Sequence, residues 1–201
     1  IRRGREEGGS GALARGSRGE LGWLAHAGPP EEIFAAGRFA REFGLRLHLV
    51  HAPLAGESAA LLKEGGVGVV CGPFDASTPL RALRSPAALA AAGVPIAFCT
   101  DGPAHEPEAL RLSAALAVRA GLDPERALRA LTTEAAALLG ATDRVGSLEP
   151  GRDADLVVWS GNPLDLATRP LAVIVGGEIV WEEGARKTRR AGEPVAPEVR
   201  P

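Results

Sequence analysis

The chain has 201 residues, of which 45% are apolar and 24% charged, with a formal net charge of −2. This composition is typical of a globular protein large enough to bury a core, and the near-neutral charge gives no global positive field for nucleic acid. No run of about 18 apolar residues occurs, which excludes an ordinary membrane span. We expect a cytoplasmic protein whose two cysteines, Cys71 and Cys99, are reduced core thiols, with a structural disulfide as the weaker alternative.

Both ends of the chain differ from the middle in composition. Residues 1–20 are rich in Gly, Arg, Ser and Glu, which predicts a disordered segment or the remnant of something longer. Residues 184–201 lack core residues and predict a disordered, solvated tail. Its basic residues could contact an acidic partner, but a solvated cluster is the favoured interpretation (Lys187, Arg189 and Arg190).

Between these ends, short apolar strands alternate with helices. The first helix opens at Pro29-Pro30-Glu31-Glu32, where proline and acids suit a first turn, and Gly44 ends it. The pattern then repeats, with Ser85 expected as the N-cap of a later helix. Nearly all-apolar strands of this kind are typical of a parallel sheet covered on both faces. The predicted strands are 23–26, 45–51, 67–71 and 94–100, and the predicted helices between them are 57–64 and 87–92.

The pattern changes towards the carboxyl end. Helices are predicted at 107–120, 123–131 and 134–139, and short strands follow at 155–159, 172–175 and 178–182. Gly176-Gly177 between the last two strands suits a two-residue hairpin turn. We therefore expect a small antiparallel unit that begins near Asp143.

Three of the parallel strands end in side chains that can bind a metal ion. The segment Ile96–Pro103 (IAFCTDGP) is a buried strand followed by Asp101, and two earlier strands end in His26 and His51. Chemistry in parallel α/β folds collects at the carboxyl ends of the strands. Two imidazoles and a carboxylate at one rim can hold a divalent metal ion.

Two segments near the carboxyl end resemble the metal-dependent amidohydrolase superfamily, in particular its imidazolonepropionase-like branch. These are Asp143–Trp159 (DRVGSLEPGRDADLVVW) and Val173–Val180 (VIVGGEIV), and residues 114–122 and 124–128 are similar to the last barrel helices of that family. The resemblance implies an α/β fold: the carboxyl-terminal part of a TIM-like (β/α)₈ barrel at 21–142, followed by a small β-sandwich segment at 143–183.

The resemblance also assigns the rim residues. His26 matches the histidine at the end of barrel strand five, His51 that of strand six, and Asp101 the aspartate of strand eight. The His-X-His pair of strand one, and the lysine or glutamate often found on strand four, are not present in this sequence. A full barrel needs about 250 residues. The resemblance therefore implies a carboxyl-terminal fragment.

The implied activity is hydrolysis of a non-peptide C–N bond in a small amide- or lactam-like substrate. Metal-activated water would attack, Asp101 would carry the proton, and His51 would bind metal or polarise the carbonyl. Zinc is the cation that these ligands favour, with His26, His51 and Asp101 as metal residues. Gly102-Pro103 stands where this branch often has His-Pro, which weakens any inference about the leaving group. With an incomplete ligand set, the chain alone is expected to show negligible turnover.

A second class of function stays open, in which the chain is a non-catalytic half-barrel module. Open strand edges favour pairing, so such a module would act as a homo-oligomer or by binding a partner.

Other residues of chemical interest have plainer interpretations. His48 precedes His51 by three and is expected to face the helices as a packed histidine. His105 is interpreted as a loop histidine without a role, and Asp153 and Asp155 as turn residues. Phe74 and Asp75 are expected at the rim, where they could shape a pocket.

Overall fold

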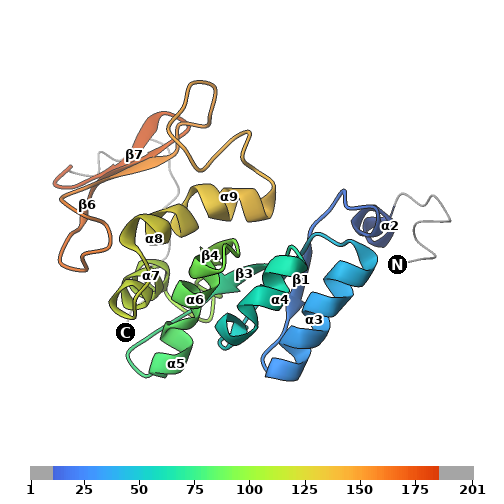
Figure 1. The fold of residues 1–201 in the computed structure, drawn as a ribbon. Coiled ribbons are helices and arrows are strands. Elements are labelled where there is room, and N and C mark those ends of the chain that lie inside the picture. Colours follow the sequence, from blue (N-terminus) through green and yellow to red (C-terminus); the bar gives the residue numbers. More distant parts are fainter. Residues whose placement is uncertain (1–10, 186–201) are drawn as a thin grey trace, which may run out of the picture.

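The computed structural model describes residues 11–185, which form an α/β fold with two separate sheets (Figure 1). The larger sheet is parallel, in the sequential order β1-β2-β3-β4. Because all four strands run the same way, their carboxyl ends form one rim. The strands are β1 (Trp23–His26), β2 (Leu47–Val50), β3 (Gly68–Cys71) and β4 (Ile96–Phe98).

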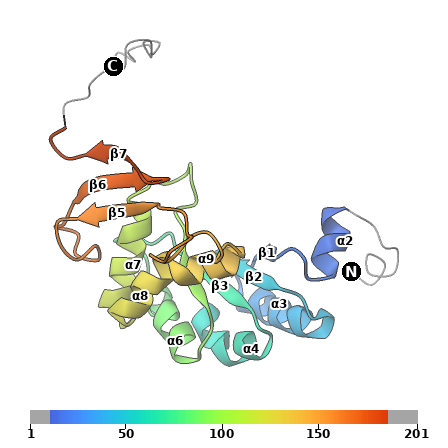
Figure 2. The same cartoon turned by 90° about the horizontal axis from the view of Figure 1, so that it is seen from above.

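Helices cover one face of this sheet and form the core with it. The connecting helices α3 (Pro30–Phe43), α4 (Ala59–Glu64) and α6 (Ser85–Ala91) lie side by side beneath the strands in Figure 2. Register places Leu49, Val69 and Ile96 in one row across β2, β3 and β4, and all three are fully buried. The predicted alternation of strands and helices is confirmed in this region.

Local signals account for several helix ends. Pro30 lies in the first turn of α3, and Gly44 ends the helix in the left-handed conformation, with φ 56°. Asp123 caps α8 (Pro124–Leu131), since its carboxylate accepts a hydrogen bond from the Arg126 N–H at 2.8 Å.

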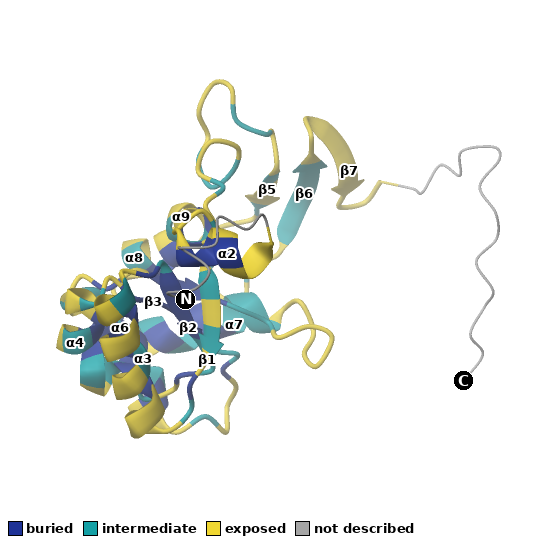
Figure 3. Cartoon of the chain, turned by 90° about the vertical axis from the view of Figure 1, so that its right-hand side faces the viewer, coloured by how far each residue is buried: buried dark blue, intermediate teal, exposed yellow. Residues whose placement is uncertain are grey.

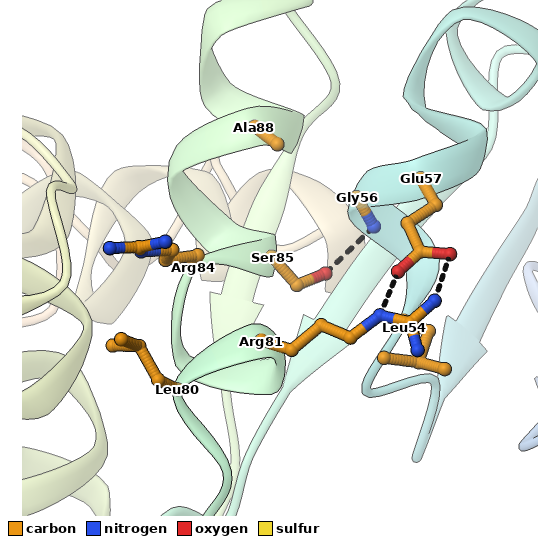
Figure 4. Close-up of a pocket in the computed structure, with 8 residues that line it drawn as sticks. All are labelled: Leu54, Gly56, Glu57, Leu80, Arg81, Arg84, Ser85 and Ala88. Carbon is orange, nitrogen blue, oxygen red and sulfur yellow. Dashed lines mark hydrogen bonds and ion pairs between the residues drawn. The ribbon is translucent and has the colours of Figure 1, made fainter.

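Two short helices and one cap differ from expectation. The 3-10 helix η1 (Ala55–Ser58) precedes α4, and α5 (Leu80–Leu83) precedes α6. Ser85 lies inside α6 and is not its N-cap, because its hydroxyl accepts a hydrogen bond from the Gly56 N–H at 2.7 Å (Figure 4). The serine thus joins two elements 29 residues apart in the chain.

The expectation of disorder across residues 1–20 is wrong for the part that the structure describes. Residues 12–17 form α2 (Ala12–Ser17), which places Gly16 against the Trp23 ring; a Cβ at Gly16 would lie 2.8 Å from a ring carbon. The helix is stabilised by this contact with β1, which composition does not reveal. Residues 1–10 and the basic cluster at 187–190 lie outside the described residues.

Helix α9 (Thr133–Leu139) lies on the opposite side of the parallel sheet from α3, α4 and α6 (Figure 2). It contacts the amino ends of the strands. The Glu134 carboxylate accepts a hydrogen bond from the Ile96 N–H at 3.1 Å, and the Arg46 guanidinium donates to the carbonyls of Ala137 and Leu138. Helix α9 therefore covers the amino ends of the strands, and we call this the closed end of the sheet.

The smaller sheet is antiparallel, in the order β5-β6-β7, with β5 (Leu156–Trp159), β6 (Pro170–Val175) and β7 (Glu178–Glu182). The predicted hairpin is confirmed, since Gly176 and Gly177 both have positive φ. The Asp155 carboxylate accepts the Gly176 N–H at 2.7 Å, and Asp153 pairs with Arg144, so both aspartates have the structural roles expected of them.

The two sheets differ in burial and are joined through α7 (Ala109–Arg119). The parallel sheet is largely buried, whereas every residue of β7 is exposed (Figure 3). The Arg111 guanidinium lies 4.9 Å from the centre of the Trp159 ring and donates to carbonyls in the β5–β6 loop. Among the helices of residues 11–185, none is long and apolar enough to cross a membrane.

Candidate metal centre

The structure brings His26, His51 and Asp101 to one rim of the parallel sheet. His26 is the last residue of β1, His51 directly follows β2, and Asp101 lies three residues beyond β4. The His51 Nε2 and Asp101 Oδ1 atoms are 3.4 Å apart, and the rings of His26 and His51 meet edge to face with centroids 4.9 Å apart. Side chains 75 residues apart in the sequence therefore share one site.

The backbone at two of these residues is unusual. His51 has φ 53° and Asp101 has φ 55°, and they are the non-glycine residues found in the left-handed region within residues 11–185. This conformation costs an L-residue roughly 1–2 kcal/mol. Strained residues of this kind cluster at functional sites. Here both strained residues lie just beyond the ends of their strands, at the same rim.

The spacing of the donor atoms suits part of a metal shell. Two ligands bound to tetrahedral zinc at about 2.0–2.1 Å lie about 3.3 Å from each other, close to the observed 3.4 Å between His51 and Asp101. In the part of the chain that the structure describes, however, no group of three or more His, Cys, Asp or Glu side chains is arranged to hold an ion. The rim thus fits two donors, one from His51 and one from Asp101, with a second imidazole, that of His26, beside them.

A cavity of about 370 Å³ opens beside this pair. His51, Asp101 and His105 line it, together with Phe74 and Thr78. His105, which the sequence suggested was a loop residue without a role, therefore lies on the wall of the candidate site. Its position follows from the fold of the loop after Asp101, which no local pattern revealed.

Asp75 does not take part in this site. Its carboxylate accepts hydrogen bonds from the hydroxyl and N–H groups of Ser77 and from the Thr78 hydroxyl, and these bonds lower the pKa of Asp75. It is a turn residue. A second cavity, of about 310 Å³, lies between η1 and α6, beside the Arg81–Glu57 ion pair, and contains none of the candidate metal residues (Figure 4).

His48 is buried, as expected of a packed histidine, and the helix above it is α9. Gly68 leaves the space that it needs, since a Cβ there would lie 2.9 Å from His48 Nδ1 and 2.4 Å from Leu138 Cδ2. Burial lowers the pKa of His48, and the nearby Arg46 guanidinium lowers it further, while the Leu138 backbone partly opposes the shift. This histidine is structural.

Both cysteines are free thiols, as expected. Burial raises the pKa of Cys71, and burial together with the Asp101 carboxylate raises that of Cys99. Neutral thiols are poor nucleophiles, which leaves the imidazoles and the carboxylate as the candidate reactive groups of the rim.

The sequence model of the amidohydrolase family matches residues 27–180, and the chain belongs to that family. The chain is 34% identical to the imidazolonepropionase of Geobacillus kaustophilus over 146 residues, which cover 68% of this chain and 34% of that protein. It is 40% identical to the imidazolonepropionase of Acidiphilium cryptum over 123 residues, 59% of this chain and 30% of that one. These similarities confirm the imidazolonepropionase-like branch.

Solved structures agree with this assignment. An amidohydrolase from Thermotoga maritima superposes with a TM-score of 0.73 at 34% identity, covering 90% of this chain and 51% of that one. The chain thus spans about a third of the length of these two imidazolonepropionases and about half that of the Thermotoga protein.

Proposed function

We propose that the chain carries part of the active site of a metal-dependent hydrolase that cleaves a non-peptide C–N bond, in an amide or lactam. The observation that carries the proposal is the 3.4 Å approach of His51 and Asp101, both in the left-handed conformation, at the carboxyl-end rim of the parallel sheet. Family membership supports it and does not favour a purely non-catalytic module. The barrel context, with 21–142 as a partial (β/α)₈ barrel and 143–183 as a sandwich segment, belongs to the same proposal.

Each of the three rim residues would have its own role. His51 Nε2 and Asp101 Oδ1 are the metal donors, and His26 is the third ligand from this chain. A bound divalent cation, which we propose to be zinc, would supply Lewis acidity and make water more acidic. The free oxygen of Asp101 can accept a proton from attacking water and return it to the leaving nitrogen. The substrate carbonyl would lie in the cavity beside His51.

We also propose that this chain holds only part of the ligand set of the metal site. Within residues 11–185 no three donors are arranged around one point, so His26 would have to shift towards His51 and Asp101 when a cation binds, and we propose that the remaining ligands come from chain that these residues do not contain. We expect negligible turnover of amides and lactams by the 201-residue chain in excess Zn²⁺. Sustained metal-dependent turnover would overturn this part of the proposal.

Metal titration tests the assignment. Zn²⁺ binding to the full chain, followed by calorimetry, should weaken by about tenfold or more in His51→Ala and in Asp101→Asn. His105→Gln is the matched control, because His105 lines the same cavity but is not a proposed ligand. Equal Zn²⁺ affinity in all three variants would contradict the assignment.

A further inference from the structure

We propose that the cavity between η1 and α6 is a second ligand site, which takes a compact organic anion that carries a short apolar group, such as a small branched carboxylate. The site is separate from the candidate metal centre. Of the residues that line this cavity, Ser85 alone also lines the cavity beside His51 and Asp101. The proposal therefore holds whether or not a cation occupies the rim.

Two helical segments form the walls of this second cavity. Leu80, Arg84 and Ala88 are spaced by four residues along α5 and α6, and Arg84 itself is helical at φ −80° and ψ −16°, so the three lie in one row. The facing wall comes from η1. Gly56 lets the two segments meet, since a Cβ there would lie 2.9 Å from the Ser85 main chain. The resulting cavity of about 310 Å³ has room for a short organic molecule.

The cavity holds one positive charge that no neighbouring acid balances. The Glu57 carboxylate accepts two hydrogen bonds from the Arg81 guanidinium, so these two charges offset each other. In Figure 4 Arg81 reaches towards Glu57, whereas Arg84 points to the other side of Ser85. Among the described residues, Arg84 has no ion-pair or hydrogen-bond partner. A bound anion would supply the missing partner.

A buried hydroxyl adds a neutral donor to the same wall. Ser85 is 6% exposed, and its Oγ accepts the Gly56 N–H at 2.7 Å, which fixes the oxygen at the cavity. Within residues 11–185 the Ser85 hydroxyl donates to no acceptor, in contrast to the buried hydroxyl of Ser113, which donates to the Ala109 carbonyl. A buried donor without a partner costs free energy that a carboxylate oxygen on the ligand would recover.

Apolar side chains line the rest of the cavity. Leu80 is 54% exposed and lies next to Arg84 in the helix row, and Leu54 of the facing wall is half-buried. A ligand that covers Leu80 gains the free energy of apolar burial, and one that reaches Arg84 gains a charge-assisted hydrogen bond. A molecule that joins a short apolar chain to an anion does both, whereas an inorganic anion or a neutral hydrocarbon does only one.

Isovalerate, isovaleramide and acetate test these two requirements. The first two share a branched chain and differ in charge, and acetate keeps the charge without the branched chain. We would titrate each into the full chain and follow the Gly56 amide by NMR, with chelator and again with Zn²⁺. Isovalerate should bind at least about threefold more tightly than either of the others. The Gly56 response should be the same with chelator and with Zn²⁺, because the rim belongs to the other cavity.

Two variants assign the affinity to the wall. Arg84→Gln should weaken isovalerate binding about fivefold and leave isovaleramide unchanged. Arg119→Gln is the matched control, because Arg119 is an exposed arginine in the last turn of α7 that does not line the cavity. Leu80→Ala should weaken isovalerate about threefold and acetate hardly at all. All three positions are exposed, and circular dichroism establishes that the variants are folded.

Four results would overturn the proposed site. These are isovaleramide or acetate that binds as tightly as isovalerate, no detectable binding of isovalerate, a folded Arg84→Gln that binds isovalerate normally, and a chelator-treated chain in which the Phe74 amide responds and the Gly56 amide does not. Phe74 reports on the other cavity, which it lines. Zn²⁺ affinity that depends on His51 and Asp101 decides the proposed function separately, so either proposal can fail while the other stands.

Discussion

At the amino ends of the parallel strands, polar side chains bind main-chain atoms, whereas at the carboxyl ends they face one another. Glu134 accepts the Ile96 N–H and Arg46 donates to the end of α9, so the polar groups of the first region close the sheet. His51 and Asp101 of the second region approach to 3.4 Å in a costly backbone conformation. One end of the sheet therefore carries stabilising contacts and the other carries the proposed site, the arrangement that parallel α/β folds generally have.

The largest expected effect is at the closed end. Glu134→Ala removes the partner of the buried Ile96 N–H and of Arg126, whose Nε lies 2.9 Å from the carboxylate, and should lower the free energy of unfolding by about 3 kcal/mol. Urea unfolding measures this, with Glu125→Ala as the exposed control that should change little. If the two variants are equally stable, α9 does not close the sheet as described. Zn²⁺ binding by folded Glu134→Ala should be unchanged.

Gly68→Ala is expected to cost somewhat less, about 2 kcal/mol. The new methyl group would overlap Leu138 Cδ2 at 2.4 Å, so α9 must shift. Thermal unfolding checks the loss, and Gly68→Ala combined with Leu138→Ala should recover part of it by removing the clash. A double variant that is no better than the sum of the single changes would show that Leu138 is not the obstacle.

The buried His48 should make the free energy of unfolding depend on pH. Because its pKa is lowered in the folded state, the unfolded chain binds a proton first as the pH falls below about 6.5, and stability is lost from there downwards. The loss is at most about 1.4 kcal/mol for each pH unit. Urea unfolding at about pH 7.5 and 5.5 should show a smaller drop in His48→Leu than in the unaltered chain. Equal drops would mean that His48 does not titrate as described.

The smallest effect concerns strain at the open end. Asp101→Gly should be about 1 kcal/mol more stable than Asp101→Ala, because both lose the carboxylate but only alanine keeps the cost of φ 55°. Both variants should lose the same fraction of Zn²⁺ affinity. Equal stability of the two would remove strain as evidence for function.

The sequence predicted the parts of the fold that depend on local signals. Gly44 ends α3, Asp123 caps α8, and Gly176-Gly177 turns the hairpin, because each needs only its neighbours in the chain. Ser85 and α2 were mispredicted, since the bond from Gly56 and the contact with Trp23 join segments that the pattern treats separately.

In the candidate site, too, some features could be predicted from local sequence and others could not. The strand ends predicted that His26, His51 and Asp101 share a rim, and their proximity is observed. Phe74 lines the cavity, in agreement with its expected place after the third strand. The left-handed backbone at His51 and Asp101, and the place of His105 on the cavity wall, depend on loop conformations that the sequence does not encode locally.

The most direct measurement is anomalous diffraction at the zinc edge from crystals of the chain grown with Zn²⁺. We predict one strong peak at the carboxyl-end rim, about 2.0–2.2 Å from His51 Nε2 and from an Asp101 carboxylate oxygen. Zinc bound elsewhere on the molecule, with none between these two side chains, would contradict the account.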